Sequence, residues 1–216
     1  PAGSTSRLAA FPTAATSAAA PGVAVAKGGH AAIGSHTVVT DGEILGNITA
    51  FGDNGTDLES PAAQIQFVVD GDPSVAGTDA TDMPGRIVFK TSTNATDTLT
   101  ERLRIDNAGK VGIGIAGPDS NLHVWNGDAG SVAAVANTVL TVENSTHAYL
   151  SILTPNDTVG GIVFGDVASN VAGRLLYTHD PASPQGFQFY VEGTERMRID
   201  NAGSVYIGDT VNTKMT

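Results

Sequence analysis

The sequence TERLRIDNAGKVGIG at residues 100–114 returns almost unchanged as TERMRIDNAGSVYIG at residues 194–208. In each copy, aliphatic residues alternate with Arg and Asp, which is the period-two pattern of a strand with one apolar and one polar face. The block Asp-Asn-Ala-Gly then supplies turn residues, because Asp favours the first position of a turn and Gly readily adopts a positive φ angle. Each copy therefore predicts a β-hairpin.

The apolar face of each predicted hairpin needs a cover. In the first copy this face carries Leu103, Ile105, Val111 and Ile113; the second copy carries Met197, Ile199, Val205 and Ile207. Each such side chain gains about 1.5–3 kcal/mol when it is fully buried, but an isolated two-stranded ribbon has nothing to bury it against. The cover comes either from neighbouring strands of the same chain or from the same hairpin in symmetry-related chains.

Composition and charge narrow the possible functions. Only 6% of the 216 residues are aromatic and 26 are Gly, so apolar surface is thin and spread out. The net charge of −11 argues against binding to nucleic acid or insertion into an anionic membrane, because phosphate binding needs clustered Lys and Arg. The sequence has no Cys, and hence no disulfide and no thiolate for a metal site or for catalysis. We predict no catalytic residue, no cofactor and no bound metal.

The ends of the sequence carry few structural signals. The N-terminus lacks the basic and apolar regions of a signal peptide, and no apolar run approaches the ~20 residues of a membrane span. The sequence does not begin with Met, so we expect a processed chain or a piece of a longer polypeptide. Residues 1–27, rich in Ala, Ser, Thr and Pro, predict an extended arm or linker, with a short Ala-rich helix over residues 14–20 as the alternative.

The rest of the sequence predicts two β-modules without helices. We place module 1 at residues 28–118, a connector at 119–138, module 2 at 139–210 and a tail at 211–216. Apart from the hairpins, Gly85-Arg86-Ile87-Val88-Phe89 matches Gly173-Arg174-Leu175-Leu176-Tyr177, with the difference in spacing assigned to a loop at residues 181–184. The predicted strands are 43–51, 64–70, 86–91, 102–106, 110–115, 122–125, 139–142, 149–154, 161–164, 174–178 and 187–192, followed by the second hairpin.

The repeated phrase TERLRIDNAGKVGIGIAGPDSNLHV resembles a motif common in tail-fibre and related appendage proteins of tailed bacteriophages and prophages. Residues 41–73 and MPGRIVFKTS from Met83 are similar to segments of the same proteins, and the second module is similar to another variant of them. Together these similarities cover most of residues 41–124 and 139–208.

The resemblance implies an elongated, fibrous homotrimer in which strands of three chains share a threefold axis, with a β-sandwich-like or β-prism-like arrangement of the modules. It implies a structural role in a virion appendage outside the bacterial cell, assembled in the host cytoplasm with other virion proteins, and a contribution to attachment to a glycan or protein receptor. Members of this group often continue into a self-cleaving chaperone domain or a receptor-binding tip. The second hairpin is instead followed by DTVNTKMT, which favours a shaft or connector.

Three rival interpretations remain open. The first is a capsid-attached or baseplate-attached fibre of the same architecture without an adhesive role. The second is a polysaccharide-degrading tailspike fragment, because 22 acidic residues can always supply a carboxylate pair at the required spacing of ~5–9 Å. The third is a cellular filament that polymerises without closing into a trimer.

Three groups of residues could carry binding chemistry. Asp53, Asp57 and Glu59 lie in a turn that could hold Ca²⁺, but their spacing does not fit an EF-hand and acidic turns are usually only solvated. Arg102, Arg104, Arg196 and Arg198 alternate with the apolar residues of the hairpins. We expect them to pair with Asp and Glu across strands or between chains, with binding of acidic glycans as the alternative. The histidines lack metal-type spacing and are expected at the surface or at an interface: His30, His36, His123, His147 and His179.

Overall fold

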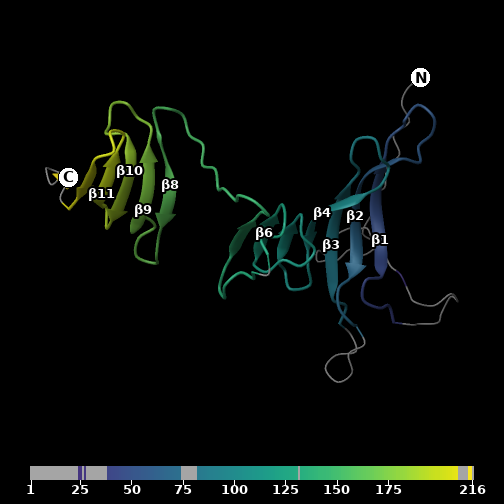
Figure 1. Ribbon diagram of the computed structural model, residues 1–216. Coiled ribbons are helices and arrows are strands. Elements are labelled where there is room, and N and C mark those ends of the chain that lie inside the picture. The colour runs from purple at the N-terminus through teal and green to yellow at the C-terminus, as the bar shows by residue number, and fades with distance from the viewer. Residues whose placement is uncertain are drawn as a thin grey trace, which may run out of the picture. The chain divides into compact units, whose positions relative to one another are not determined.

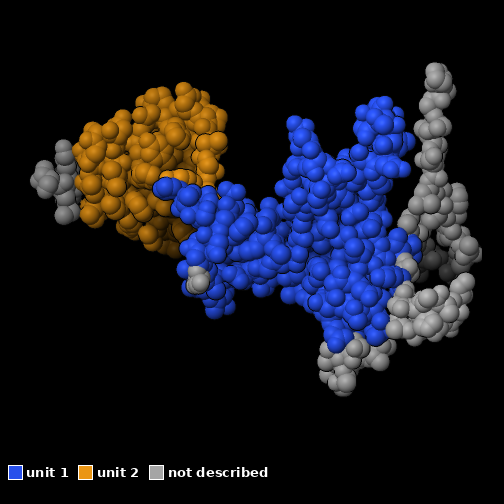
Figure 2. Space-filling view, turned by 45° about the vertical axis from the view of Figure 1, so that its right-hand side comes forward, with its two compact units in different colours: residues 1–148 blue, residues 149–216 orange. Residues whose placement is uncertain are grey.

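The computed structural model describes residues 24, 25, 27, 38–73, 82–130 and 132–208, together with the backbone of 214–215. In these ranges the chain is all-β and forms strands but no helix, which confirms the predicted fold class. The chain divides into two compact units, Pro1–Ala148 and Tyr149–Thr216 (Figure 2). The described ranges hold no helix with the length and hydropathy needed to cross a membrane.

Unit 1 contains a single sheet in which seven strands lie side by side in their sequence order. Its first five strands form an antiparallel meander, whereas β6 is parallel to both β5 and β7. The strands, most of them labelled in Figure 1, are β1 (Ile44–Phe51), β2 (Pro61–Val69), β3 (Gly85–Thr91), β4 (Thr100–Ile105), β5 (Val111–Ile113), β6 (Leu122–Trp125) and β7 (Leu140–Glu143).

Unit 2 also contains a single sheet, which is an antiparallel meander throughout. Its strands again follow the sequence order, and β8 to β11 lie next to one another in Figure 1. They are β8 (Val159–Phe164), β9 (Gly173–Thr178), β10 (Gly186–Val191), β11 (Thr194–Asp200), β12 (Val205–Ile207) and β13 (Lys214–Met215). The described residues of each unit form one sheet and therefore no sandwich of two sheets; a prism requires further copies of the chain and stays a prediction.

The two sheets repeat the same five-stranded arrangement, with β1 to β5 corresponding to β8 to β12. Phe89 pairs with Leu103 across β3 and β4, and Phe189 pairs with Met197 across β10 and β11. In both pairs of strands a β-bulge follows directly, and the next cross-strand pair involves Glu101 or Glu195. The repeat detected in the sequence therefore extends well beyond the two hairpins.

This pairing corrects the correspondence drawn from the sequence. The strand that contains residues 85–89, β3, pairs with the first strand of its hairpin, whereas the strand that contains residues 173–177, β9, is separated from its hairpin by β10. The structural counterpart of β3 is therefore β10, and that of β2 is β9. The strand predicted at residues 187–192 is confirmed as β10 (Gly186–Val191), and this extra strand, not only a longer loop at residues 181–184, separates β9 from the second hairpin.

Two predicted strands near the module boundary also differ. The strand predicted at residues 139–142 is observed as β7, but it pairs with β6 and completes the first sheet instead of opening the second. The strand predicted at residues 149–154 is absent: these residues join no ladder among the described strands. The boundary between the units thus lies at Ala148, later than the predicted start of module 2 at residue 139.

The predicted arm at residues 1–27 lies outside the described residues except for Ala24, Val25 and Lys27, and the tail at 211–216 lies outside them except for the backbone of β13.

Candidate functional site

The turns of the two hairpins have the geometry that their sequence predicts. The Asp106 carboxylate accepts the backbone N–H groups of Ala108 and Lys110 at 3.0 and 2.8 Å. Gly109 and Gly203 adopt φ angles of 77° and 81°, a region that disfavours residues with a side chain. In the second turn the Asp200 carboxylate accepts the N–H groups of Ala202 and Ser204 at 3.0 and 2.8 Å. The hairpin prediction is confirmed in both copies.

One face of the first sheet carries two continuous rows of apolar residues that cross all seven strands. They follow from the pairing register, because residues directly opposite one another in neighbouring strands share a face. The first row consists of Ile48, Ile65, Phe89, Leu103, Ile113, Val124 and Val142. The second consists of Gly46, Phe67, Ile87, Ile105, Val111, Leu122 and Leu140. We call these the apolar rows of the sheet.

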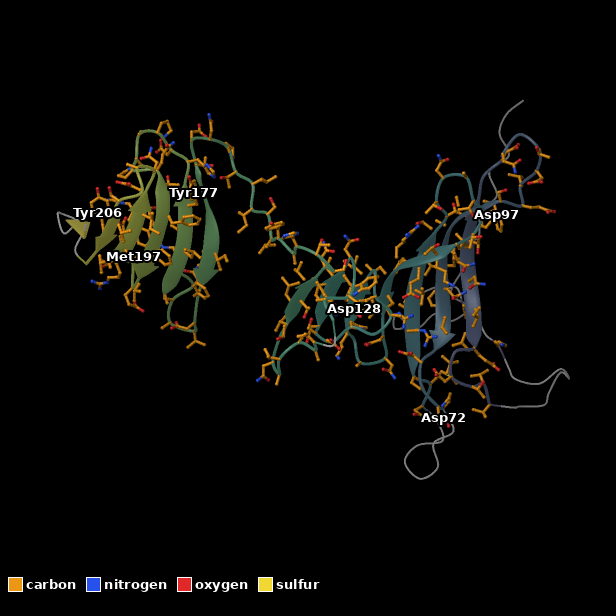
Figure 3. All side chains as sticks on the ribbon, in the orientation of Figure 1. Asp72, Asp97, Asp128, Tyr177, Met197 and Tyr206 are labelled. Carbon is orange, nitrogen blue, oxygen red and sulfur yellow. The ribbon has the colours of Figure 1, made fainter. Side chains whose placement is uncertain are left out.

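The second sheet has apolar rows in the same places, and Figure 3 labels one member of each, Met197 and Tyr177. The first row consists of Ile162, Leu175, Phe189, Met197 and Ile207. The second consists of Gly160, Tyr177, Phe187, Ile199 and Val205. None of the four rows contains a charged residue.

Many members of these rows remain open to solvent in the single chain. Ile48, Phe89, Ile113, Phe187 and Ile207 are all exposed. By contrast, Val68 and Val88, which alternate with row residues along β2 and β3 and so lie on the opposite face, are buried. The neighbouring strands therefore extend the apolar face of each hairpin without covering it. The sequence allowed the apolar face of each hairpin to be buried either by neighbouring strands or by other copies of the chain. The neighbouring strands of the same sheet do not bury it.

The opposite face of each sheet is organised by ion pairs of the hairpin arginines. Arg104 binds Glu101 through two contacts of 2.6 and 2.9 Å, which raises the pKa of Arg104. Arg198 lies 3.7 Å from Glu195 and stacks over the ring of Tyr206, with its guanidinium carbon 4.8 Å from the ring centroid. Arg104 and Arg198 thus pair with acidic residues, but each partner lies three residues away in the same strand, whereas the sequence predicted pairing across strands or between chains.

The other two hairpin arginines behave differently because of the β-bulges. Arg102 is the extra residue of the bulge in β4, since Phe89 pairs with Leu103 and Lys90 with Glu101. Its Nε atom donates to the Thr91 hydroxyl of the neighbouring strand at 3.0 Å instead of to a carboxylate, and an acidic partner for Arg102 in another chain stays a prediction. Arg196 is the corresponding extra residue in β11 and is exposed.

The acidic turn proposed for Ca²⁺ uses its carboxylates internally. Asp53 accepts the N–H of Gly55 at 2.9 Å. Asp57 accepts the N–H of Glu59 at 3.1 Å and the Asn54 side-chain amide at 3.2 Å. No three His, Cys, Asp or Glu side chains within the described ranges gather as a metal site.

The histidines do not form one group. His30 and His36 lie outside the described residues. His123 is buried, with its Nε2 atom 2.9 Å from a carboxylate oxygen of Glu143, so the expected surface or interface position is wrong for it within unit 1. His147 is exposed, and the half-buried ring of His179 lies 4.8 Å from that of Tyr177.

Sequence reasoning missed a cleft of about 560 Å³ beside the single tryptophan, Trp125. The connection between the parallel strands β6 and β7 encloses it, and Asp119, Asp128 and Glu143 line it. Asp128, labelled in Figure 3, accepts the N–H of Gly130 at 2.7 Å. Glu143 accepts the N–H of Ala129 at 2.8 Å in addition to its contact with His123. These two carboxylates hold the connecting loop, and only the parallel pairing of β6, which is not apparent from local sequence, brings them together.

Comparisons with known proteins give similarity in structure alone. No protein-family description matches the chain, and no curated protein matches it. The carboxy-terminal domain of the L-shaped tail fibre of bacteriophage T5 aligns over 96% of this chain and 93% of its own, at 13% identity and a TM-score of 0.44. The structure of that domain with its intramolecular chaperone domain aligns over 96% of this chain and 64% of its own, at the same identity and TM-score. Both values are too low to assign the chain to a family.

Proposed function

We propose that this protein is a structural component of a bacteriophage virion fibre, forms a homotrimer through its apolar rows and contributes to host attachment. It lies outside the cell on an assembled virion, contacts other virion proteins and catalyses no reaction. One observation carries the proposal: both sheets of one chain present uncharged apolar rows that the chain itself leaves exposed. The resemblance of the hairpin motif to phage tail-fibre sequences supports the same role.

Burial of the rows between copies supplies the energy of assembly. Each exposed aliphatic or aromatic side chain that becomes buried gains about 1.5–3 kcal/mol, and the rows contribute many such side chains from each copy. The chain carries a net charge of −11, so copies repel one another unless they meet through uncharged surfaces. The rows are such surfaces. A trimer also presents any receptor contact three times, so that weak contacts add through effective concentration.

The solution mass of the intact chain, measured by light scattering, tests the assembly. We expect three times the chain mass at neutral pH, and a trimer band in detergent electrophoresis that disappears on boiling. Ile113→Asp places a charge in a row and is expected to lower the mass to that of one chain. The matched control is Leu58→Asp, at an exposed apolar residue outside the strands, which should stay trimeric. A folded wild-type monomer would refute the trimer.

Host attachment is tested separately with antibodies raised against the protein. They are expected to label an appendage of the virion and to slow adsorption to bacteria. Labelling without an effect on adsorption would retain the fibre and remove its adhesive role. Absence of labelling on intact virions would refute the location.

A further inference from the structure

We propose that residues 149–154, which open unit 2, form a layer between the second sheet of their own chain and a second copy of the chain. This rests on the proposed function and names a part of its assembly interface. The argument depends on what lies on each side of the segment.

The inner side of the segment packs over an apolar row of its own sheet. A side chain at Gly160 would begin 3.3 Å from Ile152 Cγ2 and 3.4 Å from Thr154 Cγ2, so the glycine leaves room for the segment to cross β8 closely. Between the segment and the sheet lies a cleft of about 300 Å³. The apolar residues that line it include Leu150, Ile152, Ile162, Leu175, Tyr177 and Phe187. One side of the segment therefore has an apolar contact within the chain.

The outer side is apolar as well, and none of the described residues of unit 2 covers it. Leu153 is 89% exposed, although its neighbour Ile152 contacts the sheet. The segment resembles a strand in sequence and yet joins no ladder in the described structure. Thr154 Oγ1 is buried and has no hydrogen-bond partner among the described residues. Apolar residues on both sides are typical of a segment that is buried on both faces.

The first unit contains the same arrangement at the corresponding place. Gly46 lies opposite Phe67 as Gly160 lies opposite Tyr177. A side chain at Gly46 would begin only 2.8 Å from Val25 Cβ, so Val25 lies close to β1 at this glycine, as Ile152 lies close to β8 at Gly160. The adjoining cleft has a volume of about 380 Å³ and is lined by Ala24, Val25, Leu45, Ile48 and Phe67. A feature that recurs in both repeats argues for a shared role in packing.

The recurrence identifies a second copy of the chain as the occupant. An exposed apolar residue beside a cleft, Leu153 or Val25, occurs once in each repeat, so a partner has to offer the same complementary surface twice. A parallel copy of this chain does so. Residues 149–154 include no Asp, Glu, Lys or Arg, which suits contact between copies that each carry a charge of −11.

The test compares Leu153→Asp with Val167→Asp. Both residues are exposed apolar side chains of unit 2 in the single chain, but Val167 lies in the turn after β8, away from the clefts. We expect Leu153→Asp to lower the solution mass to that of one chain with an unchanged tyrosine near-ultraviolet spectrum, and Val167→Asp to keep the wild-type mass. A trimeric Leu153→Asp variant would overturn the proposal and leave the trimer intact. A monomeric wild-type protein would instead refute the proposed function.

A second measurement covers the case in which Leu153→Asp fails to fold. The chain has no Cys, so Leu153→Cys and Val167→Cys each introduce a single thiol. In the trimer we expect the thiol at position 153 to react with a disulfide reagent at least about tenfold more slowly than the thiol at position 167, and equally fast after denaturation. Equal rates in the native trimer would overturn the proposal.

Discussion

The two hairpins share their turn but not the contact that anchors it. Around the first turn, the Asp70 carboxylate accepts the N–H of Asn107 at 2.8 Å and lies 2.5 Å from Arg86 Nη1. Around the second, the N–H of Asn201 instead donates to a neutral group, the backbone carbonyl oxygen of Gln185, at 3.1 Å. The repeated motif thus determines the geometry of the turn, whereas contacts from other parts of the sheet determine how strongly the turn is stabilised.

The distribution of chromophores allows the two units to be observed separately in the intact protein. Trp125, the single tryptophan, lies in unit 1. All four tyrosines lie in unit 2: Tyr149, Tyr177, Tyr190 and Tyr206. Tryptophan fluorescence therefore reports unfolding of the first unit and tyrosine near-ultraviolet circular dichroism that of the second, at matched protein concentrations.

The largest difference in free energy of unfolding between the two units is expected when the side chains that contact the turns, Asp70 and Gln185, are replaced. Asp70→Ala leaves the half-buried Arg86 without its closest partner, so we expect unit 1 to lose about 2–3 kcal/mol in free energy of unfolding. Gln185→Ala keeps the backbone carbonyl that accepts the N–H of Asn201 and removes only neutral side-chain hydrogen bonds, from the Asn201 amide at 3.3 Å and to the His179 carbonyl oxygen at 2.7 Å, so it should cost unit 2 about 1 kcal/mol. Urea titration with the two optical signals measures both. Equal losses would contradict the difference between the anchors.

The turns themselves should respond alike. Asp106→Ala and Asp200→Ala each remove two hydrogen bonds from backbone N–H groups to a carboxylate, and each should cost its own unit about 2 kcal/mol. Asp97→Ala, at an exposed loop residue of unit 1, is the control and should change the stability by less than about 0.5 kcal/mol. A difference between the two turn variants of more than about 1 kcal/mol would show that the turns are not equivalent.

A smaller difference in free energy of unfolding is expected between variants of the two ion pairs next to the β-bulges. Glu101→Gln replaces a two-contact pair with Arg104 and should cost unit 1 about 1 kcal/mol. Glu195→Gln weakens a longer pair and should cost unit 2 about 0.5 kcal/mol. Burial and the charge of Glu195 both raise the pKa of Tyr190, whose hydroxyl lies 3.4 Å from that carboxylate. Glu195→Gln should therefore also lower the pKa of Tyr190 in an absorbance titration; an unchanged pKa would contradict this contact.

The smallest effect concerns pH. Burial raises the pKa of Asp70, but the N–H of Asn107 and the guanidinium of Arg86 outweigh it, and the pKa lies below its usual range. Because the pKa of Asp70 is lower in the folded than in the unfolded protein, its carboxylate stabilises the native state above the unfolded-state pKa of about 3.9. This stabilisation is lost as the pH falls through the folded-state pKa. The stability gap between wild type and Asp70→Ala should therefore narrow below about pH 4. A gap that stays constant from pH 6 to pH 3 would contradict the assignment.

Local sequence predicted the local structure. The alternation in each hairpin and its Asp-Asn-Ala-Gly turn fix the strands, the turn and the apolar face, because all three depend on residues close together in the chain. Contacts between residues that lie far apart in the sequence could not be predicted. Asp70 reaches Asn107, and Ser120 reaches the Thr141 hydroxyl at 2.8 Å, only because intervening strands pair in a particular order.

The incorrect predictions have a similar physical cause, because they also depend on which strands lie side by side. The similarity of residues 85–89 to residues 173–177 reflects common strand composition, whereas register depends on which strand lies next to which. Residues 149–154 predict a strand because they form a short run rich in apolar residues that ends at the turn residues Pro155, Asn156 and Asp157, yet composition does not supply a backbone partner. The Trp125 cleft depends on the parallel pairing of β6 with β5 and β7, which no local pattern encodes.

In both sheets every strand lies beside the one synthesised just before it. A chain leaving the ribosome can therefore add strands to a growing edge one at a time, and the first sheet requires nothing beyond Ala148. The same order extends the apolar rows with each added strand. If the proposed trimer forms, each new chain therefore exposes its rows for an interval that lasts until other copies reach it.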